Sequence, residues 1–477
     1  MRIIGNRGNT ARKVQAVASG ALASGDTVIV NADGTVSVVA DFLPTVFSES
    51  STGISAATFD SSSNKVVIAY QDAGNSNYGT AVVGTVSGTS ITFGSPVVFG
   101  STNATMYPQG ITFDSNSNKI VVAYRDFTNS QYGTAIVGTV SGTTISFGSP
   151  VVFRSGGTSW ISATFDSGNN KIVISYQDNG NSSYGTAIVG TVSGTSISFG
   201  SATIYESGTA NYTVATFDSD SGKVVIPYSD GTNGGYGTAV VGTVSGTSIS
   251  FGTPVVFESA ASAWLGSTFD STANKVVIAY YDQGNSSFGT AIVGTVSGTT
   301  ISFGSPVVFE SSSTNTLSPI FNSNTGKVVI AYRDSGTSNY GTAVVGTVSG
   351  TSISFDTPIV YQNSSTSFQS TAFDSNSNEV VIAYQDTSNS SYGTALVFQN
   401  ITPNLTSENF IGIASNGYAT GQAATINAKG FIDDNQSSLT AGQSYYVQTN
   451  GDLGLTAADP SVFAGTAVSA TKLIVKG

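Results

Sequence analysis

The sequence of 477 residues contains no cysteine and no histidine, and charged residues make up only 9% of it. Without cysteine there is no disulfide framework, no thiolate nucleophile and no Cys-ligated zinc. Without histidine the commonest general base and the commonest transition-metal ligand are missing, and a Ser-His-Asp triad is impossible. These absences weigh against most hydrolytic and transition-metal chemistry.

Positive charge is also scarce, with 16 Lys and Arg against 28 Asp and Glu and a net charge of −12. No basic run tracks phosphates, so we expect no nucleic-acid binding. No stretch approaches the ~20 apolar residues of a membrane helix, so we expect no membrane insertion. Ser, Thr, Asn and Gly must cover the surface, while 26 Phe and 21 Tyr can build a large β core.

The main positive feature of the sequence is an internal repeat. A Phe followed by Asp, or by Asn322 in the sixth copy, recurs at a spacing of 54 residues once and 52 residues thereafter. A Tyr-x-Asp motif begins eleven residues after each Phe, and a Tyr-Gly-Thr-Ala motif follows, with Phe288 in place of Tyr in the fifth copy. The repeated residues are Phe59, Phe113, Phe165, Phe217, Phe269, Phe321 and Phe373, which define copies one to seven.

Each copy has the pattern of four strands, which in the third copy cover 161–165, 171–176, 184–192 and 196–199. Turn-forming residues separate them, except that the fourth strand leads to the next copy through a variable connection, which is 154–161 between the second and third copies. Four antiparallel strands per ~50 residues are typical of a propeller blade. A solenoid coil is usually shorter, and sandwich domains need ~100 residues each. We therefore predict an all-β fold with a seven-bladed propeller of four-stranded blades.

The two ends of the repeat array indicate how the ring closes. The seventh copy stops after its third strand, at 394–398. Pro44 and Phe47 precede Pro96 and Phe99 by one 52-residue period, so a fourth strand stands before the first copy. We predict that this N-terminal strand completes the last blade, and that the propeller spans residues 36–399.

Residues 1–35 and 400–477 lie outside the repeats. The simplest interpretation is one small β-rich domain, a base formed by both chain ends, although two separate subdomains would also fit. Two strand–turn–strand patterns with the same spacing support a β structure. They are marked by Gly25, Val30, Gly34 and Val36 in one end, and by Gly442, Val447, Gly451 and Leu453 in the other.

The C-terminal segments 438–454 (SLTAGQSYYVQTNGDLG) and 464–477 (AGTAVSATKLIVKG), with 409–414 before them, resemble C-terminal modules of tailed-bacteriophage virion proteins. Tail-fibre and other structural proteins of marine cyanobacterial phages are most similar. The resemblance covers about the last 70 residues and segment 14–39, but not the propeller. It implies a place on the virion, and the lack of a secretory-type apolar run near the N-terminus fits assembly in a host cytoplasm.

Two segments vary most among the copies, the loop between the second and third strands and the connection to the next copy. Strand direction alternates, so both emerge on one face, which is the candidate binding face. Five residues before the repeat Phe, the occupants include both tryptophans of the chain. We hypothesise that Trp160, Tyr212, Trp264 and Phe368 form an aromatic rim for a glycan or protein receptor. Alternatively, they begin the first strand of each blade and plug the central channel. The full set is Ile54, Pro108, Trp160, Tyr212, Trp264, Thr316 and Phe368.

Charged residues give weaker signals. Each loop after the second strand begins with one Asp, which predicts turn capping in preference to calcium binding. Arg125 and Arg333 follow the Tyr of the Tyr-x-Asp motif, where they either pair with the adjacent Asp or contact an anionic ligand. No acid stands out from the repeat as a glycosidase pair requires. We therefore predict no enzyme activity, no cofactor and no bound metal. The repeated acids are Asp72, Asp126, Asp178, Asp230, Asp282, Asp334 and Asp386.

These observations lead to a non-enzymatic virion surface protein, a tail fibre or tail-associated adhesin whose propeller faces the host. Its expected partners are other virion proteins through the base, further copies of itself, and a host-surface glycan or protein. One alternative is a capsid-decoration or tail structural protein without a ligand. Another is a host-encoded lectin-like or surface-layer propeller.

Overall fold

The computed structural model describes residues 2–4, 13–39, 42, 44–105, 110–399, 405–448, 451–457 and 460–476. The chain divides into two compact units, Pro44–Asn400, and Met1–Leu43 together with Ile401–Gly477. In the described part, all regular structure is β-strand apart from short 3-10 helices. No helix in these ranges is long and apolar enough to cross a membrane. The predicted all-β class is confirmed.

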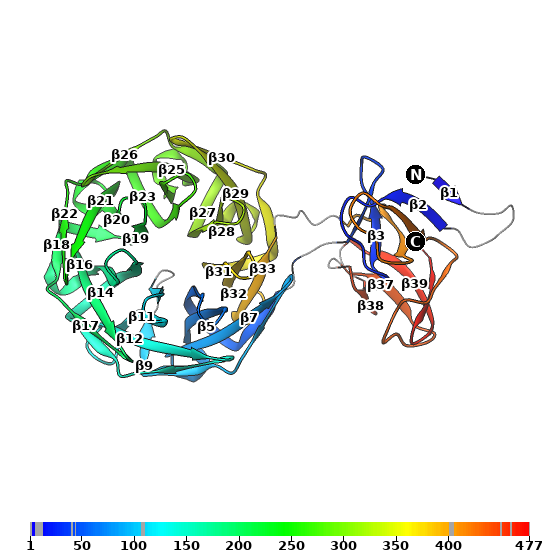
Figure 1. Ribbon diagram of the computed structural model, residues 1–477, viewed down its shortest axis with the longest axis horizontal. Helices are drawn as coiled ribbons and strands as arrows, with labels where there is room; N and C mark the ends of the chain where they lie inside the picture. The colour runs from blue at the N-terminus through cyan, green and yellow to red at the C-terminus, as the bar shows by residue number, and fades with distance from the viewer. Residues whose placement is uncertain are drawn as a thin grey trace. The chain divides into compact units, whose positions relative to one another are not determined.

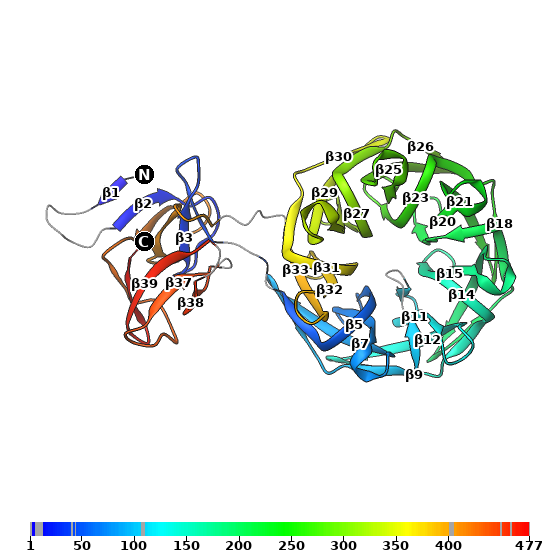
Figure 2. The ribbon, with the colours of Figure 1, turned by 180° about the vertical axis from the view of Figure 1, so that it is seen from behind.

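The first unit is a propeller, in which antiparallel strands form radial sheets around a central axis (Figures 1 and 2). Each of the seven sequence copies contributes one central hairpin of its second and third strands. The hairpins are β6 (Lys65–Asp72) with β7 (Tyr78–Ser87), β11 (Lys119–Asp126) with β12 (Tyr132–Ser141), β15 (Lys171–Asp178) with β16 (Tyr184–Ser193), β20 (Lys223–Asp230) with β21 (Tyr236–Ser245), β24 (Lys275–Asp282) with β25 (Phe288–Ser297), β28 (Lys327–Asp334) with β29 (Tyr340–Ser349), and β32 (Glu379–Asp386) with β33 (Tyr392–Phe398).

Short strands follow the third strand of copies one to six. They are β8 (Ser90–Phe93), β13 (Thr144–Phe147), β17 (Ser196–Phe199), β22 (Ser248–Phe251), β26 (Thr300–Phe303) and β30 (Ser352–Phe355). Long strands then lead toward the next hairpin. They are β5 (Thr45–Asp60), β14 (Val151–Asp166), β23 (Val255–Asp270), β27 (Val307–Asn322) and β31 (Ile359–Asp374), with the interrupted pairs β9 (Val97–Thr105) and β10 (Ile111–Asp114), and β18 (Thr203–Asn211) and β19 (Thr216–Asp218).

The variable connection predicted at 154–161 is not a loop, and this expectation was wrong. It lies within β14, whose first half pairs with β12 and whose second half pairs with β15 of the next blade. A bulge shifts the register between Ser159 and Ser162. A bulge bends and twists a strand without reversing it, so the chain passes from the outer edge of one blade to the inner strand of the next without a turn. The passage still lies beside the loops after the second strand, because Gly157 pairs with Tyr132 and Thr158 with Asp178.

The predicted closure of the ring is confirmed. β5, which precedes the first hairpin, pairs with β33 of the last, with Val46 opposite Thr394 and Ser48 opposite Gly393. The N-terminal strand therefore completes the blade that the C-terminal copy begins. Closure in this way leaves no unpaired edge at the seam of the sheet.

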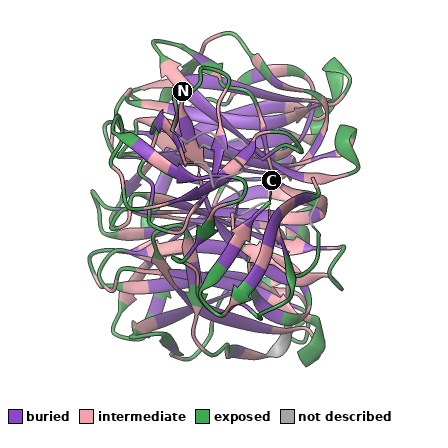
Figure 3. Cartoon of the chain, turned by 90° about the vertical axis from the view of Figure 1, so that its right-hand side faces the viewer, coloured by how far each residue is buried: buried purple, intermediate pink, exposed green. Residues whose placement is uncertain are grey.

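The repeated aromatic residues form the core of each blade. The Tyr of each Tyr-x-Asp motif is almost completely buried, and in the third copy Tyr176 packs on Phe153 at 5.3 Å between ring centroids. The second strand is buried on both faces, because Ile172, Val173 and Ile174 contact neighbouring blades on opposite sides. Figure 3 shows the same division, with buried strands and exposed turns. Each such side chain contributes about 1.5–3 kcal/mol.

The second unit contains two antiparallel sheets. The first has the order β1 (Arg2–Ile4), β2 (Lys13–Val17), β35 (Ala423–Asn427), β34 (Phe410–Ala414), β3 (Thr27–Val30) and β4 (Val36–Val38). The second has the order β36 (Ile432–Asp433), β40 (Lys472–Val475), β39 (Val462–Ser469), β37 (Ser444–Val447) and β38 (Leu453–Gly454). The first sheet thus combines strands from both chain ends, which pair through β2 with β35 and β3 with β34.

Both predicted strand–turn–strand units are present, as β3 with β4 and as β37 with β38. Because β4 pairs with β3, residues 36–38 belong to the base and not to the propeller. The units therefore divide at residues 43 and 44 and not at the expected residues 35 and 36. The core under the sheets joins Ile29 to Val447 and Leu473.

Candidate functional site: an aromatic pocket at the centre of the ring

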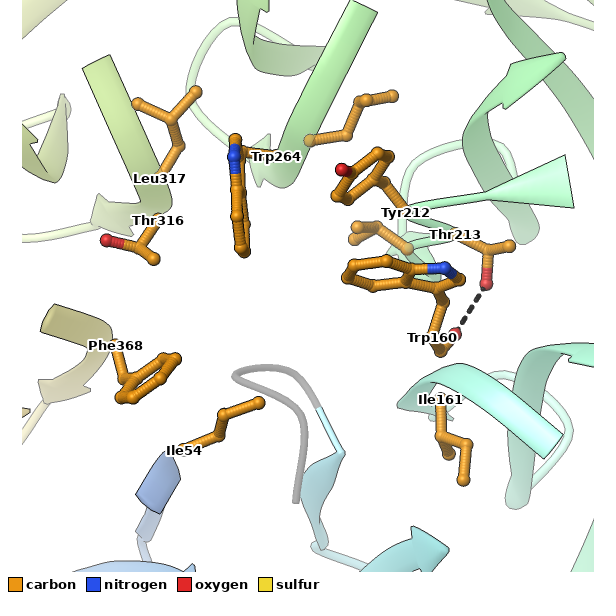
Figure 4. Close-up of a pocket in the computed structure, with 11 residues that line it drawn as sticks. Ile54, Trp160, Ile161, Tyr212, Thr213, Trp264, Thr316, Leu317 and Phe368 are labelled. Atoms are coloured by element: carbon orange, nitrogen blue, oxygen red, sulfur yellow. Dashed lines mark hydrogen bonds between the residues drawn. The ribbon is translucent and has the colours of Figure 1, made fainter. Parts of the chain in front are cut away.

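A pocket lies at the centre of the propeller, and the variable residues five positions before the repeat Phe line it (Figure 4). Its cavity volume is about 60 Å³, well below the roughly 300–1,000 Å³ of pockets that enclose a whole drug-sized ligand. The site is therefore suited to contact one part of a larger ligand. Among the described residues, this position is represented by Ile54, Trp160, Tyr212, Trp264, Thr316 and Phe368, while Pro108 lies outside them.

The four residues predicted as an aromatic rim therefore come together in one cavity. The rings of Trp160 and Tyr212 lie 4.1 Å apart, those of Tyr212 and Trp264 5.5 Å apart, and those of Trp160 and Trp264 6.2 Å apart. Figure 4 shows Phe368 and Ile54 across the cavity from Trp160 and Tyr212. The rings are half-buried. They meet at the channel, as the plug alternative supposed, yet leave open space between them.

The backbone at this position is unusual. It adopts the left-handed region at Trp160 (φ 49°), Tyr212 (52°), Trp264 (49°), Thr316 (50°) and Phe368 (56°). Bulky residues rarely adopt this conformation, which costs of order 1–3 kcal/mol at each site. A bulge accompanies it in β14, β23, β27 and β31, whereas Tyr212 lies between β18 and β19, and Ile54, beside the bulge of β5, is not left-handed. The residue after each left-handed position, except that after Phe368, also lines the pocket. These followers are Ile161, Thr213, Leu265 and Leu317, with Val214 after Thr213.

Some other left-handed positions of the repeat carry Asn or Gly, which suit them. The turn between the first and second strands has Asn170 or Gly222, and the turn after the third strand has Gly194, although the loop after the second strand has Ser182 and Ser183. The pocket position has an aromatic or β-branched residue in every copy where the structure shows positive φ. Glycine would adopt this backbone without strain. The side chains at this position therefore have a role that outweighs the backbone cost.

Hydroxyl groups between neighbouring blades hold the strained segment. Thr213 Oγ1 donates to the Trp160 carbonyl at 2.9 Å, and the Ala215 amide donates to Ser162 Oγ at 2.9 Å. Equivalent contacts recur between other blades, such as the Ala57 amide to Ser370 Oγ at 2.8 Å. Satisfied buried polar groups fix a single arrangement of the strands. The pocket is thus preformed.

The sequence prediction missed Ile54, Thr316 and the followers as lining residues. The first two occupy the same repeat position as the aromatic residues, so the position itself was the signal. Thr316 Oγ1 donates to Gln369 Oε1 of the next blade. The residues that follow them could not be predicted in this way, because the sequence does not reveal the backbone conformation that directs two successive side chains into the pocket.

The lining determines what chemistry the pocket offers. No carboxylate or amine is present among its described lining residues, so these provide no general acid–base pair. Burial, and in second place the nearby Tyr281, raise the pKa of Tyr212, which therefore keeps its hydroxyl proton at neutral pH. The pocket offers flat aromatic surfaces, aliphatic walls and a few hydroxyl groups.

The repeated loop acids act as turn caps, as predicted, except Asp178, which makes no such bond and pairs with Arg154. Asp230 Oδ1 accepts from the amides of Thr232 and Asn233 at 3.0 and 3.2 Å, at the start of a short 3-10 helix, Gly231–Asn233. Asp334 accepts from the Gly336 amide in the same way, at 2.8 Å. Across the part of the chain that the structure covers, no group of three acids is placed to hold a metal ion.

No protein-family model matches the sequence, and no curated protein matches it. Among solved structures, the BP39L lectin from Burkholderia pseudomallei superposes with a TM-score of 0.54 at 10% identity, over 73% of this chain and 96% of the lectin. A protein from Lactobacillus plantarum gives 0.47 at 12% identity, over 78% and 98%. The SapL1 lectin in complex with alpha methyl fucoside gives 0.41 at 14% identity, over 65% and 96%. The likeness to BP39L shows a shared fold.

Proposed function

We propose that this protein is a non-enzymatic carbohydrate-binding protein that holds its ligand in the central aromatic pocket. The observation that carries the proposal is the placement of Trp160, Tyr212 and Trp264 in left-handed backbone around one open cavity. Residues with strained backbone dihedrals are concentrated at functional sites, where the strained conformation is part of how the site works. The apolar face of a sugar ring fits a half-buried aromatic surface, while the ligand's hydroxyl groups remain near the rim.

Two further observations support this proposal. The described lining has no acid–base groups, which fits a ligand that is bound and not transformed. BP39L, which superposes with a TM-score of 0.54, is a lectin. A carbohydrate is therefore a better candidate than a peptide.

The pocket contains both tryptophans of the chain, so intrinsic fluorescence reports its occupancy directly. We expect saccharides to change the tryptophan emission of the native protein in a saturable way. A variant with Trp160→Ala and Trp264→Ala should retain its fold by circular dichroism and lose binding in calorimetry. Ile204→Ala is the matched control, because Ile204 is exposed on the outer strand β18. Unchanged binding by the double variant would exclude this pocket.

A second proposal concerns location and rests on the C-terminal segments 438–454 and 464–477 that resemble virion modules. In this proposal the base attaches to a virus particle and the propeller meets the host surface. Immunogold labelling of particles from the source culture, with peptide counting, tests it. Label at the tail favours an adhesin, and even label over the head favours a decoration protein. Particles without label would reject the virion location and leave a host-encoded lectin.

A further inference from the structure

A set of polar residues stands at one repeat position next to the pocket residues. It is formed by the residue that follows the buried Tyr of each Tyr-x-Asp motif, and we call it the collar. Its members are Gln71, Arg125, Gln177, Ser229, Tyr281, Arg333 and Gln385. The collar lies between the pocket residues and the loops after the second strand, because Gln177 pairs with Ser159, which precedes Trp160.

Collar side chains reach across the boundary between blades. Gln177 Nε2 donates to Asn211 Oδ1 of the next blade at 2.8 Å, and Asn211 precedes Tyr212. Arg125 Nη1 donates to Ser159 Oγ at 3.4 Å, and Ser159 precedes Trp160. The collar is therefore directly beside the residues that line the pocket.

The two arginines of the collar lack the partner that the sequence suggested. They do not pair with the adjacent Asp126 and Asp334, since the single ion pair in the described ranges joins Arg154 to Asp178. The Nε atoms of Arg125 and Arg333 are buried without a hydrogen-bond partner. A buried donor left unsatisfied costs about 1–3 kcal/mol, and more when it is charged. In a chain of net charge −12, neither guanidinium group therefore has a carboxylate partner among the described residues, and Arg125 bonds only to the neutral oxygens of Ser159 and Gln131.

These arginines stand at the two ends of the aromatic arc. Trp160, Tyr212 and Trp264 come from copies three to five, and the arginines come from copies two and six. Arg125 reaches the residue before Trp160, at one end. Arg333 pairs with Asn315, which precedes the pocket residue Thr316, at the other.

The side chains at these paired positions share one side of the sheet. In the first copy the equivalent residues are Gln71 and Gly53, and a Cβ added to Gly53 would lie 3.1 Å from Gln71 Cβ. Arg333 and Asn315 occupy the equivalent repeat positions and are direct cross-strand partners. Arg125 is further oriented by Gln131 Oε1, to which its Nη2 donates, and by the Phe127 ring, 4.5 Å from its guanidinium carbon.

We propose that the ligand of the central pocket is an acidic saccharide, one that carries carboxylate or sulfate groups. This inference rests on the proposed carbohydrate-binding function. The sugar ring packs on the arc of Trp160, Tyr212 and Trp264, and its acidic groups accept hydrogen bonds from Arg125 or Arg333. Guanidinium groups suit carboxylate and sulfate oxygens because they offer several donors in one plane.

The chain itself supplies matched variants for the test. Arg125→Gln and Arg333→Gln place in the collar the residue that copies one, three and seven already carry. Arg154→Gln is the control, because it removes the same charge away from the collar, at a position where the seventh copy has Gln362 bound to Asp386 at 2.8 Å. All variants should retain the fold.

The probes are an oligogalacturonate and its fully methyl-esterified form, and a sulfated galactan oligosaccharide and its desulfated form. Tryptophan fluorescence and calorimetry would measure their affinities. We expect native protein and the Arg154→Gln variant to bind at least one acidic form about tenfold or more tightly than its neutral counterpart. The Arg125→Gln, Arg333→Gln double variant should lose this preference.

Each other outcome has a distinct meaning. Equal affinity for acidic and neutral forms, still abolished by Trp160→Ala, would overturn the acidic ligand and leave carbohydrate binding intact. An acidic preference that survives in the collar variant would overturn the role of Arg125 and Arg333. No response to any saccharide, acidic or neutral, would overturn the proposed function as well.

Discussion

The ring of Phe47, near the start of the propeller, lies against the backbone of Gly393, near its end. A Cβ added to Gly393 would come within 2.3 Å of Phe47 Cε2 and 2.6 Å of Phe47 Cζ. Five other glycines at this repeat position have the same relationship to an aromatic residue, as Gly237 has to Phe257. The contact between Phe47 and Gly393 differs from the others because it joins the first and last parts of the propeller, since β5 and β33 come from opposite ends of the repeat array.

Gly393→Ala is expected to lower the free energy of unfolding by about 1–3 kcal/mol, because the added methyl group forces the Phe47 ring from its place. Urea denaturation followed by circular dichroism measures the change. Gly157→Ala is the control, since its Cβ would meet only Asn179 Cβ at 3.5 Å and the fifth copy already has Ala261 there. Equal effects of the two substitutions would contradict a specific clash at the seam.

The left-handed backbone of Trp160 can be tested apart from its side chain. Trp160→Gly and Trp160→Ala both remove the indole, but only glycine adopts φ near 49° without strain. We expect the glycine variant to be more stable by about 1 kcal/mol, as measured by denaturation. At Ile204, in a regular exposed strand, the order should reverse. Alanine being the more stable choice at both positions would argue against the bulge conformation.

The buried tyrosines predict a loss of stability at alkaline pH. Burial raises the pKa of Tyr70 to about 12, from an ordinary value of about 10. The folded state therefore keeps a proton that the unfolded state loses, so stability is complete below pH 10 and declines as the pH rises toward 12. The decline is about 1.4 kcal/mol per pH unit for Tyr70, and the equivalent tyrosines add to it.

Unfolding midpoints in urea between pH 8 and pH 11.5, with phenolate absorbance at 295 nm as a second signal, would show this decline. Tyr70→Phe should make it less steep, because the folded state then no longer protects that proton. A titration in which most tyrosines ionise near pH 10 while the protein remains folded would contradict the burial.

Glu258→Gln is expected to stabilise the protein at neutral pH. Burial, and then the charge of Asp282, raise the pKa of Glu258, whose Oε2 accepts from Tyr280 at 3.1 Å. Since the folded pKa is raised, the stabilising contribution of Glu258 is present below about pH 4.5 and is lost as the pH rises. The neutral amide avoids this loss and can donate to Asp282, as Gln362 does to Asp386.

The gain should stay below about 1 kcal/mol, because Glu258 is only partly buried and solvent screens its charge. Thermal unfolding at pH 7 and pH 3.5 would measure it, with little difference between variant and native protein at the lower pH. Glu408→Gln, at an exposed position in the base, should change neither value. A destabilised Glu258→Gln variant at pH 7 would indicate that the charge itself is required there.

The sequence by itself determined the propeller and its closure. Hairpins depend on residues close in the chain, such as the turn at Gly194 between β16 and β17, so local turn chemistry and a regular period were sufficient. The closing strand was visible because Pro44 and Phe47 keep the period of the array. The aromatic position was also visible, as a variable site in an otherwise constant repeat.

Only the tertiary structure decided how the pocket is made. The bulge at 159–162 depends on how a long strand passes between two blades, and it turns both Trp160 and Ile161 toward the centre. The meeting of Trp160 with Trp264 depends on the packing of several blades around one axis. The isolation of Arg125 from Asp126 follows from contacts across a blade boundary. Such relations join residues from different strands and blades, 34 positions apart for Arg125 and Ser159, and no local pattern in the sequence encodes the distance between them.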